Sequence, residues 1–209
     1  MKKSLSLMTA ALLALGLSTT AFASPLKNYD AGHVAIDAGV TLPSSVKGDN
    51  YKMSKSNSTY AGATLGIGND MALNYKWNNY KADEAKTRAQ QFNLMYKVLP
   101  GLSAYAGYLH ADTSSDIAPG KTKNSGQVGL SAAYDIPLLF TVWGNVGVGT
   151  KNAGYEIGVS KAIFNNVELN ASYYDQKFND AFGDDKDMKA KGVNLGVTVK
   201  FIRFLALDY

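Results

Sequence analysis

Apolar residues alternate with polar or small residues through most of this sequence. In residues 33–42, for example, Val34, Ile36 and Val40 alternate with Asp37 and Thr41. Successive side chains of a β-strand point to opposite faces, so this period of two predicts a strand with one apolar face. The same alternation recurs in residues 71–78, 92–98, 127–134, 140–149, 155–160, 167–174 and 192–201. Residues 59–68 and 102–111 predict two further strands, whose Gly- and Ala-rich composition leaves their facing open.

The connections between these strands alternate in length. Short segments rich in turn-forming residues lie at 69–70, 99–101, 135–137 and 164–166, and longer polar segments at 43–58, 79–91, 112–124 and 179–190, with a brief one near 151–152. Strands of about ten residues with short turns at one end and long loops at the other are typical of transmembrane barrels. The sequence therefore predicts an all-β fold, a transmembrane antiparallel up-and-down β-barrel of about 10 strands, with 8 as the next alternative.

The first residues have the pattern of a secretory signal peptide. Lys2 and Lys3 form a basic start, residues 5–17 are mostly apolar, and small residues flank Phe22 at positions 21 and 23. A membrane anchor is the alternative, but the apolar stretch is short for a span of about 20 residues. We expect a signal peptide at 1–23 and a barrel domain at 24–209.

A soluble β-sandwich is the competing fold, because its strands also have one apolar face. The aromatic residues favour the barrel, since most fall near strand ends on the apolar face, where transmembrane barrels carry their interface girdles. These residues are Tyr75, Trp77, Tyr96, Tyr134, Phe140, Tyr155, Tyr173 and Phe201. The absence of cysteine points the same way, because exported sandwiches often carry a disulfide.

Charge and composition exclude several classes of function. Lys+Arg 21 against Asp+Glu 17 gives a formal net charge of +4, which is too slight and too evenly spread for a nucleic-acid surface. A chain without cysteine has no thiolate metal site and no cysteine nucleophile. His33 and His110 are the two histidines and lie far apart in the sequence, which excludes a histidine-rich metal cluster. We expect no metal, no cofactor and no nucleic-acid partner.

The end of the chain resembles a known signal. Apolar residues occupy every second position and end in an aromatic residue, at Val193, Leu195, Val197, Val199 and Phe201. This pattern is similar to the C-terminal assembly signal of bacterial outer-membrane β-barrel proteins, and the chain resembles the small single-domain members of that superfamily. Family members usually end at the aromatic residue, whereas here residues 202–209 follow it.

The resemblance implies a location and a set of partners. Periplasmic chaperones and the barrel-assembly machinery of a Gram-negative-type bacterium would insert the chain into the outer membrane. Its partners there would be outer-membrane lipid and lipopolysaccharide. Both termini would lie in the periplasm, and the long loops would be extracellular.

The polar faces of the strands carry six charged residues expected to line the barrel lumen. They are Asp37, Lys76, Lys97, Glu156, Glu168 and Lys200. They could form a narrow polar channel, or pair across the lumen and close it, because an uncompensated charge in a narrow barrel is costly. The other inward residues are mostly Gly, Ala and Ser, which we expect to leave room for water. The expected function is an envelope-structural role with a narrow passive pore.

Two other classes of function remain open. An outer-membrane hydrolase or acyltransferase would need a site near His110, Asp112, Ser114 and Ser115, but neighbouring loop residues have no fixed geometry, and we expect no catalytic residue.

A surface adhesin or ligand binder would use the loops instead. Lys47, Lys52 and Lys55 could contact lipopolysaccharide phosphates. The acidic residues at 183–187 lack the pattern of a calcium-binding loop.

Overall fold

The computed structural model describes residues 25–48, 51–116, 119–182 and 186–201. Strands dominate this part of the chain, because the period of two continues from one segment to the next. The strands are β1 (Val34–Gly48), β2 (Tyr51–Met53), β3 (Ser58–Gly68), β4 (Met71–Lys81), β5 (Ala85–Leu99), β6 (Leu102–Ser115), β7 (Thr122–Ile136), β8 (Phe140–Gly149), β9 (Asn152–Phe164), β10 (Val167–Phe178) and β11 (Met188–Phe201). Among the described residues, no helix is long and apolar enough to cross a membrane.

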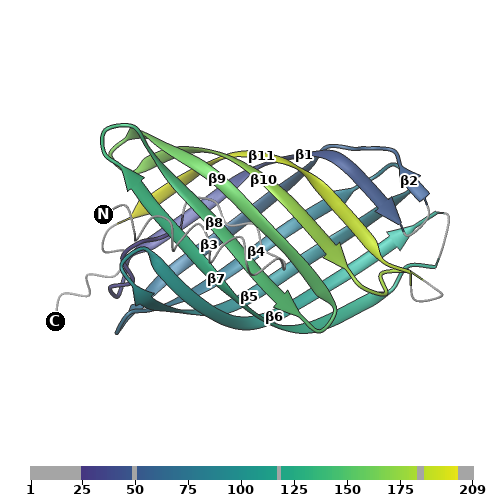
Figure 1. Ribbon diagram of the computed structural model, residues 1–209, viewed down its shortest axis with the longest axis horizontal. Helices are drawn as coiled ribbons and strands as arrows, with labels where there is room; N and C mark the ends of the chain where they lie inside the picture. Colours follow the sequence, from purple (N-terminus) through teal and green to yellow (C-terminus); the bar gives the residue numbers. More distant parts are fainter. Residues whose placement is uncertain (1–24, 49–50, 117–118, 183–185, 202–209) are drawn as a thin grey trace, which may run out of the picture.

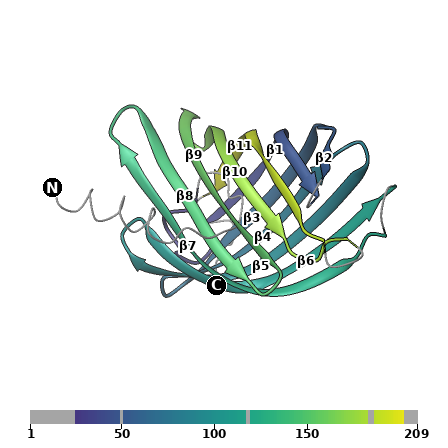
Figure 2. The same ribbon diagram turned by 45° about the vertical axis from the view of Figure 1, so that its right-hand side comes forward.

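The sheet closes on itself. Each long strand pairs antiparallel with its neighbours in sequence, and β11 pairs with β1 over residues Val34–Gly48, from Val34↔Phe201 to Gly48↔Met188. The short β2 pairs only with the end of β1, so the wall of the barrel has 10 strands. Figure 1 and Figure 2 show these strands winding at a tilt around the closed wall. The predicted ten-stranded up-and-down barrel is confirmed.

The two faces of each strand have the predicted chemistry. On β1, Ile36 is 47% exposed and Val40 43% exposed, whereas Asp37 is 7% and Thr41 2% exposed. The exposed large side chains along the outside of the wall are mainly Val, Leu, Ile, Phe and Tyr. The lumen side therefore holds the polar face, and the outside holds the apolar face.

The structure settles the facing of the two glycine-rich strands. On β3, Tyr60 and Thr64 are buried in the lumen. On β6, Tyr105 and Leu109 are buried in the lumen, while Tyr108 is exposed on the outside.

The two ends of the barrel differ. At one end of the barrel β1 starts, β11 ends and short turns connect strands at residues 69–70, 100–101, 137–139 and 165–166. We call this the turn end. Short turns were predicted at all four places, but the third lies two residues further along the chain than the predicted 135–137. At the first of these turns, Asn69 and Asp70 have positive φ values of 53° and 58°. A two-residue hairpin turn of this kind needs residues that tolerate the left-handed region, as Asn and Asp do. We call the opposite end the loop end.

The prediction of long loops at the loop end is wrong in extent. Residues 79–81 and 85–91 belong to β4 and β5, and most of residues 43–58 belong to β1 and β2. Strands continue there as paired hairpins whose outer face is polar, because that face no longer has to be apolar where it leaves the lipid. The alternation is reversed there, since apolar residues such as Tyr80 and Met188 face the lumen while Lys81 and Lys189 face outward.

An irregularity at Pro43 changes which side chains of β1 face the lumen. The pairing of β1 with β11 shifts between Pro43 and Ser45. Before Pro43 the even-numbered residues of β1 face outward, whereas after Ser45 the even-numbered Val46 is fully buried and the odd-numbered Lys47 is exposed. Proline has no N–H to donate to a neighbouring strand, which makes it a natural place for such a bulge.

Candidate functional site: the filled lumen

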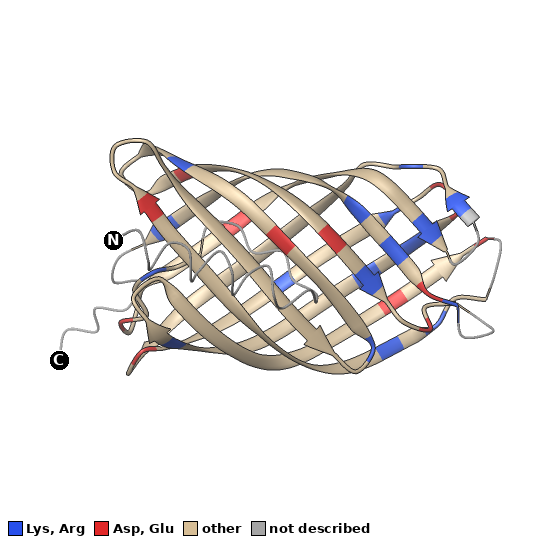
Figure 3. Cartoon of the chain, viewed as in Figure 1, with Lys and Arg blue, Asp and Glu red and all other residues tan. Residues whose placement is uncertain are grey.

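A cluster of charged side chains occupies the middle of the lumen. Lys76 on β4 and Glu156 on β9 come from opposite parts of the wall, and their Nζ and Oε2 atoms are 3.9 Å apart. Lys76 is 1% and Glu156 2% exposed. The Lys76 Nζ also lies 4.9 Å from the centroid of the Tyr60 ring, in a cation–π contact. Figure 3 shows the acidic and basic residues distributed along the wall.

Asp37 completes this cluster. In the strand register Asp37 faces Gly62, which faces Lys76 on the next strand. A Cβ atom on Gly62 would stand 2.6 Å from Asp37 Oδ2, so the glycine leaves the carboxylate room to lean over β3 toward Lys76. Glu156 in turn accepts hydrogen bonds from the Ser172 hydroxyl and from Asn194 Nδ2, the latter at 2.9 Å. Glu156 is therefore within ion-pair distance of Lys76, and the second buried carboxylate, Asp37, lies over Gly62 on the side toward Lys76.

A chain of uncharged polar side chains runs around the lumen next to this cluster. Asn74 Nδ2 donates to Thr64 Oγ1 at 3.0 Å, and Asn93 Nδ2 donates to Asn74 Oδ1 at 3.2 Å. The chain continues from Gln127 Nε2 to Asn93 Oδ1 at 2.7 Å and from Asn152 Nδ2 to Gln127 Oε1 at 3.1 Å. It links β3, β4, β5, β7 and β9, and hydrogen-bonded side chains of this kind rigidify the interior.

Large aromatic side chains fill the space beside the small inward residues. A Cβ atom on Gly39 would lie 2.6 Å from the ring of Tyr60, and one on Gly158 would lie 2.5 Å from the ring of Trp143. Trp143 also donates from Nε1 to Ser160 Oγ at 2.7 Å. The expectation that small inward residues leave room for water is therefore wrong at these positions, because neighbouring strands place rings over the glycines.

The loop end of the lumen is apolar. Rings of Tyr80, Tyr174 and Phe178 pack together, with centroids 5.6 Å apart for Tyr80 and Tyr174 and 5.4 Å for Tyr80 and Phe178. The buried cluster is Val46, Met53, Tyr80, Ala82, Ala85, Ala89, Leu109, Ala111, Tyr174, Phe178, Ala181, Phe182, Met188 and Ala190. Sequence reasoning missed it, because residues 79–91 and 179–190 were predicted to be loops. Asn78 was predicted to face inward, and counting every second residue onward from it would have placed Tyr80 on the inner face as well.

Two polar contacts connect the hairpins at the loop end. The Ser54 hydroxyl donates to Glu84 Oε1 at 2.7 Å, and this hydrogen bond lowers the pKa of the Glu84 carboxyl. Lys151 donates to Asp180 and lowers the pKa of that carboxyl in the same way. Both carboxylates are therefore charged at neutral pH and hold neighbouring hairpins together.

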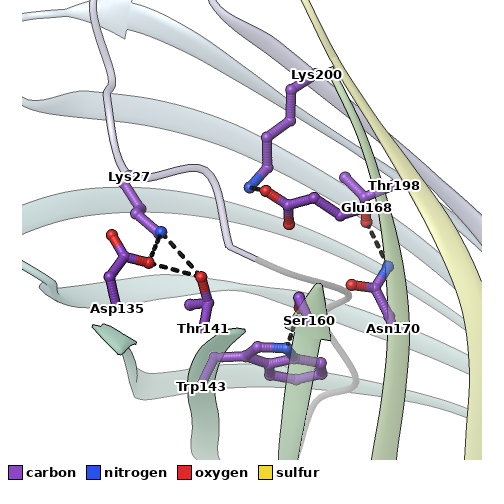
Figure 4. Close-up of polar contacts among 9 residues, drawn as sticks. All are labelled: Lys27, Asp135, Thr141, Trp143, Ser160, Glu168, Asn170, Thr198 and Lys200. Atoms are coloured by element: carbon purple, nitrogen blue, oxygen red, sulfur yellow. Dashed lines mark hydrogen bonds and ion pairs between the residues drawn. The ribbon is translucent and has the colours of Figure 1, made fainter. Parts of the chain in front are cut away.

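Residues before β1 cover the turn end of the lumen. Tyr29 is buried and its hydroxyl donates to Ser103 Oγ at 2.9 Å, while the Gly68 N–H donates to the Tyr29 carbonyl at 2.9 Å. Lys27 forms an ion pair with Asp135 and donates to Thr141 Oγ1 at 3.2 Å (Figure 4). The cavity beside this segment is about 10 Å³, room for at most one water molecule. The sequence showed no signal for this contact.

The outer surface decides the class of this protein. A closed wall has no second sheet to cover its apolar face, so exposed residues such as Leu73, Phe92 and Leu169 need a lipid environment. Aromatic residues lie on this face toward both ends, with Tyr96, Tyr134 and Phe140 toward the turn end and Tyr155 and Tyr173 toward the loop end. The chain is a β-barrel of the outer-membrane type.

Comparison with known proteins shows similarity of fold and nothing further. No protein family profile and no curated protein matches the chain. Among solved structures, Neisserial surface protein A is similar at TM-score 0.44 and 16% identity over 82% of this chain and 98% of that one. Ail, the attachment invasion locus protein of Yersinia pestis, has TM-score 0.35 and 18% identity over 82% and 99%. The KdgM porin has TM-score 0.42 and 9% identity over 80% and 99%. The assignment rests on the closed wall and its apolar exterior.

The six charged residues expected in the lumen of this barrel do not form one site. Asp37, Lys76 and Glu156 meet in the middle. Lys97 lies at the turn end, where its Nζ is 3.0 Å from Asp70 Oδ1. Lys200 and Glu168 form a separate pair at 2.6 Å, also at the turn end (Figure 4).

The expected assembly signal lies on the outside of β11. Val193, Leu195 and Val197 are exposed there, and Phe201 pairs with Val34 at the start of the barrel. The same residues therefore supply lipid-facing surface and close the wall, while their part in assembly stays a prediction. Residues 202–209 lie outside the described residues.

The residues considered for catalysis have separate hydrogen-bond partners. His110 faces outward on β6, and its Nδ1 is 2.8 Å from Asn124 Oδ1. Asp112 accepts from the Thr122 hydroxyl at 2.9 Å, and the Ser115 hydroxyl donates to the Glu84 carbonyl at 2.9 Å. In the part of the chain that the structure describes, no group of three His, Cys, Asp or Glu could hold a metal ion. Of the acidic residues at 183–187, residues 183–185 lie outside that part.

Replacing His110 with Ala is expected to leave the barrel and its lipid unchanged. The variant loses one exposed hydrogen bond to Asn124, which contributes at most about 1 kcal/mol to the free energy of unfolding. Release of fatty acid from vesicles that contain wild-type or variant protein checks this expectation. If the wild type hydrolyses lipid and the variant does not, His110 would have to be regarded as a catalytic residue.

Proposed function

We propose that this protein is an envelope-structural barrel of the outer membrane, with a lumen that is closed at rest. The observation that carries the proposal is the stacking of three buried layers along the lumen: residues 25–33 at the turn end, the Asp37–Lys76–Glu156 cluster in the middle, and the apolar cluster around Tyr80 at the loop end. Together the three layers place buried side chains along the lumen from the turn end to the loop end. A passive pore would require all three to rearrange.

The orientation in the membrane is part of the proposal. Transmembrane barrels of bacteria have short turns on the periplasmic side and longer connections on the extracellular side. The turn end would accordingly face the periplasm, and the paired hairpins at the loop end would project from the cell. Insertion would depend on the barrel-assembly machinery reading β11.

Conductance of the purified, folded protein tests the closed lumen. Wild-type protein in planar bilayers is expected to give no discrete current steps, because the three layers leave no continuous water path. Insertion is verified in parallel by the protection of the barrel from added protease. Repeated unit steps from protein shown to be inserted would replace the structural role with the narrow pore considered from the sequence.

A surface-binding role is the second candidate. The hairpins at the loop end are paired strands rather than open loops, as in β4–β5, where only residues 82–84 connect the two strands. Rigid hairpins present a fixed surface and lose little conformational entropy on binding. Replacing residues 82–84 and 119–121 by glycine-serine linkers while the barrel remains inserted would abolish cell attachment if this role holds.

A further inference from the structure

Four lysines lie side by side on the outside of the barrel at the loop end. Lys52 on β2 faces Lys47 on β1, Lys47 faces Lys189 on β11, and Lys189 faces Lys177 on β10. Residues directly opposite one another point to the same face of a sheet. We call these four residues the lysine row; strands about 4.8 Å apart make it about 14 Å long.

The protein neutralises only one side of the lysine row. Lys177 is 2.6 Å from Asp187, and Asp175 is 3.7 Å from Lys189 and 2.7 Å from Lys191 just below the row. Lys47 and Lys52 are exposed and have no ion pair with any described residue. Like charges directly opposite on neighbouring strands destabilise a sheet. The row thus has a net positive charge that the described residues do not balance.

Three lysines of the turn end, unlike those of the row, are each paired with a carboxylate. Lys97 pairs with Asp70, Lys27 with Asp135, and Lys200 with Glu168. Each of these lysines has its own carboxylate, so an uncompensated row of facing lysines is a feature of the loop end.

The height of the row on the barrel indicates a lipid rather than a soluble anion. Tyr173 and Val193 face each other on the outside of β10 and β11, and the rings of Tyr155 and Tyr173 are 6.3 Å apart. Tyrosines at this position mark the boundary between acyl chains and headgroups. Lys177 and Lys189 lie four residues further along their strands, about 13 Å along a tilted strand. The row therefore lies at the level of lipid phosphates and directly above an apolar surface.

We propose that the lysine row binds the phosphate groups of an outer-leaflet glycolipid, the lipid A part of lipopolysaccharide, whose acyl chains lie on the apolar surface below. This inference rests on the proposed orientation of the barrel. Lys47 and Lys52 supply ammonium groups that no carboxylate of the described residues pairs with, and Lys189 extends the site across the closing seam of the barrel between β1 and β11. A lipid with two phosphate groups matches the length of the row.

Binding of diphosphoryl lipid A tests the proposal. The folded protein is placed in phosphatidylcholine nanodiscs with diphosphoryl lipid A, and the bound lipid is quantified by native mass spectrometry. The double variant Lys47→Gln/Lys52→Gln is expected to bind about 20- to 30-fold more weakly, because each lysine near an anionic lipid surface contributes roughly fivefold. The variant Lys81→Gln/Lys161→Gln removes two exposed lysines outside the row and is expected to change binding by less than about threefold.

Two further measurements separate the alternatives. In detergent without anionic lipid, Lys47→Gln/Lys52→Gln is expected to be as resistant to urea as the wild type or more so, because it removes like-charge repulsion; a merely structural role would lower resistance. Inorganic phosphate at millimolar concentration should not displace the lipid, and displacement would make the row a general anion site and overturn the proposal. Equal lipid binding by wild type and double variant would also overturn it. Protein that is inserted and non-conducting but binds no lipid A would refute this inference and leave the proposed function standing.

Discussion

Replacing Lys76 with Met is expected to lower the free energy of unfolding by about 3–5 kcal/mol, because the change leaves Glu156 and Asp37 buried without their shared cation. Methionine keeps much of the volume, so the loss reports the charge rather than a cavity. The measurement is urea unfolding of the protein in lipid vesicles, followed by the fluorescence of Trp77 and Trp143.

Lys97→Met is the matched control for this experiment. Lys97 also points into the lumen, but it lies at the mouth of the barrel beside the exposed Asp70. Exposed ion pairs contribute at most about 1 kcal/mol, so this variant should unfold close to the wild type.

A triple variant tests whether the loss of stability in Lys76→Met comes from uncompensated buried charge. Lys76→Met combined with Asp37→Asn and Glu156→Gln removes all three charges and should recover most of the loss, because no buried charge is left uncompensated. If Lys76→Met alone unfolds like the wild type, the charged cluster is not buried as the structure describes it.

Replacing Gly39 with Ala is expected to destabilise the barrel by about 2–3 kcal/mol. The new Cβ atom would stand 2.6 Å from the Tyr60 ring and 2.7 Å from the Cα atom of Gly196, across the seam between β1 and β11. Neither the backbone of β11 nor a ring held under Lys76 can move without disturbing other contacts, and overpacking of this kind is destabilising. Urea unfolding in vesicles measures the effect.

Gly126→Ala is the control, since nothing lies within 4 Å of the added methyl group. Alanine restricts the unfolded chain, so this variant should be neutral or more stable by about 0.4–1 kcal/mol. Combining Gly39→Ala with Tyr60→Ala should cost less than the sum of the two single changes by about 0.5 kcal/mol or more. Strict additivity would mean that the Tyr60 ring does not restrict Gly39.

Local pattern was sufficient for much of the fold. The outward facing of Ile36, Leu73 and Leu195 follows from alternation alone, and turn-forming residues marked the connection at Asn69-Asp70. The alternation did not predict the parts of the strands that extend beyond the lipid, because the outer face does not have to be apolar there. Above the lipid level an outer face can be polar, so the strands around Lys47 and Lys189 looked like loops although their backbones remain paired.

The candidate site was predictable only in part. Alternation places Lys76 and Glu156 on the polar face of their strands, but it does not say that they meet while Lys97 and Lys200 pair elsewhere. The inward-facing Gly39 and Gly158 could be recognised in the sequence. The rings that cover them could not, because Tyr60 and Trp143 come from neighbouring strands.

The sequence by itself determined which side of most strands meets lipid and where the chain reverses at the turn end, since both depend on residues close together along the chain. It left the facing of β3 and β6 open. The tertiary structure decided what the lumen contains. Closure pairs Val34 with Phe201, and that register sets the height of every side chain around the wall. Contacts across the lumen, such as Lys76 with Glu156, and rows across the seam, such as Lys47 beside Lys189, depend on this register and have no counterpart in local periodicity.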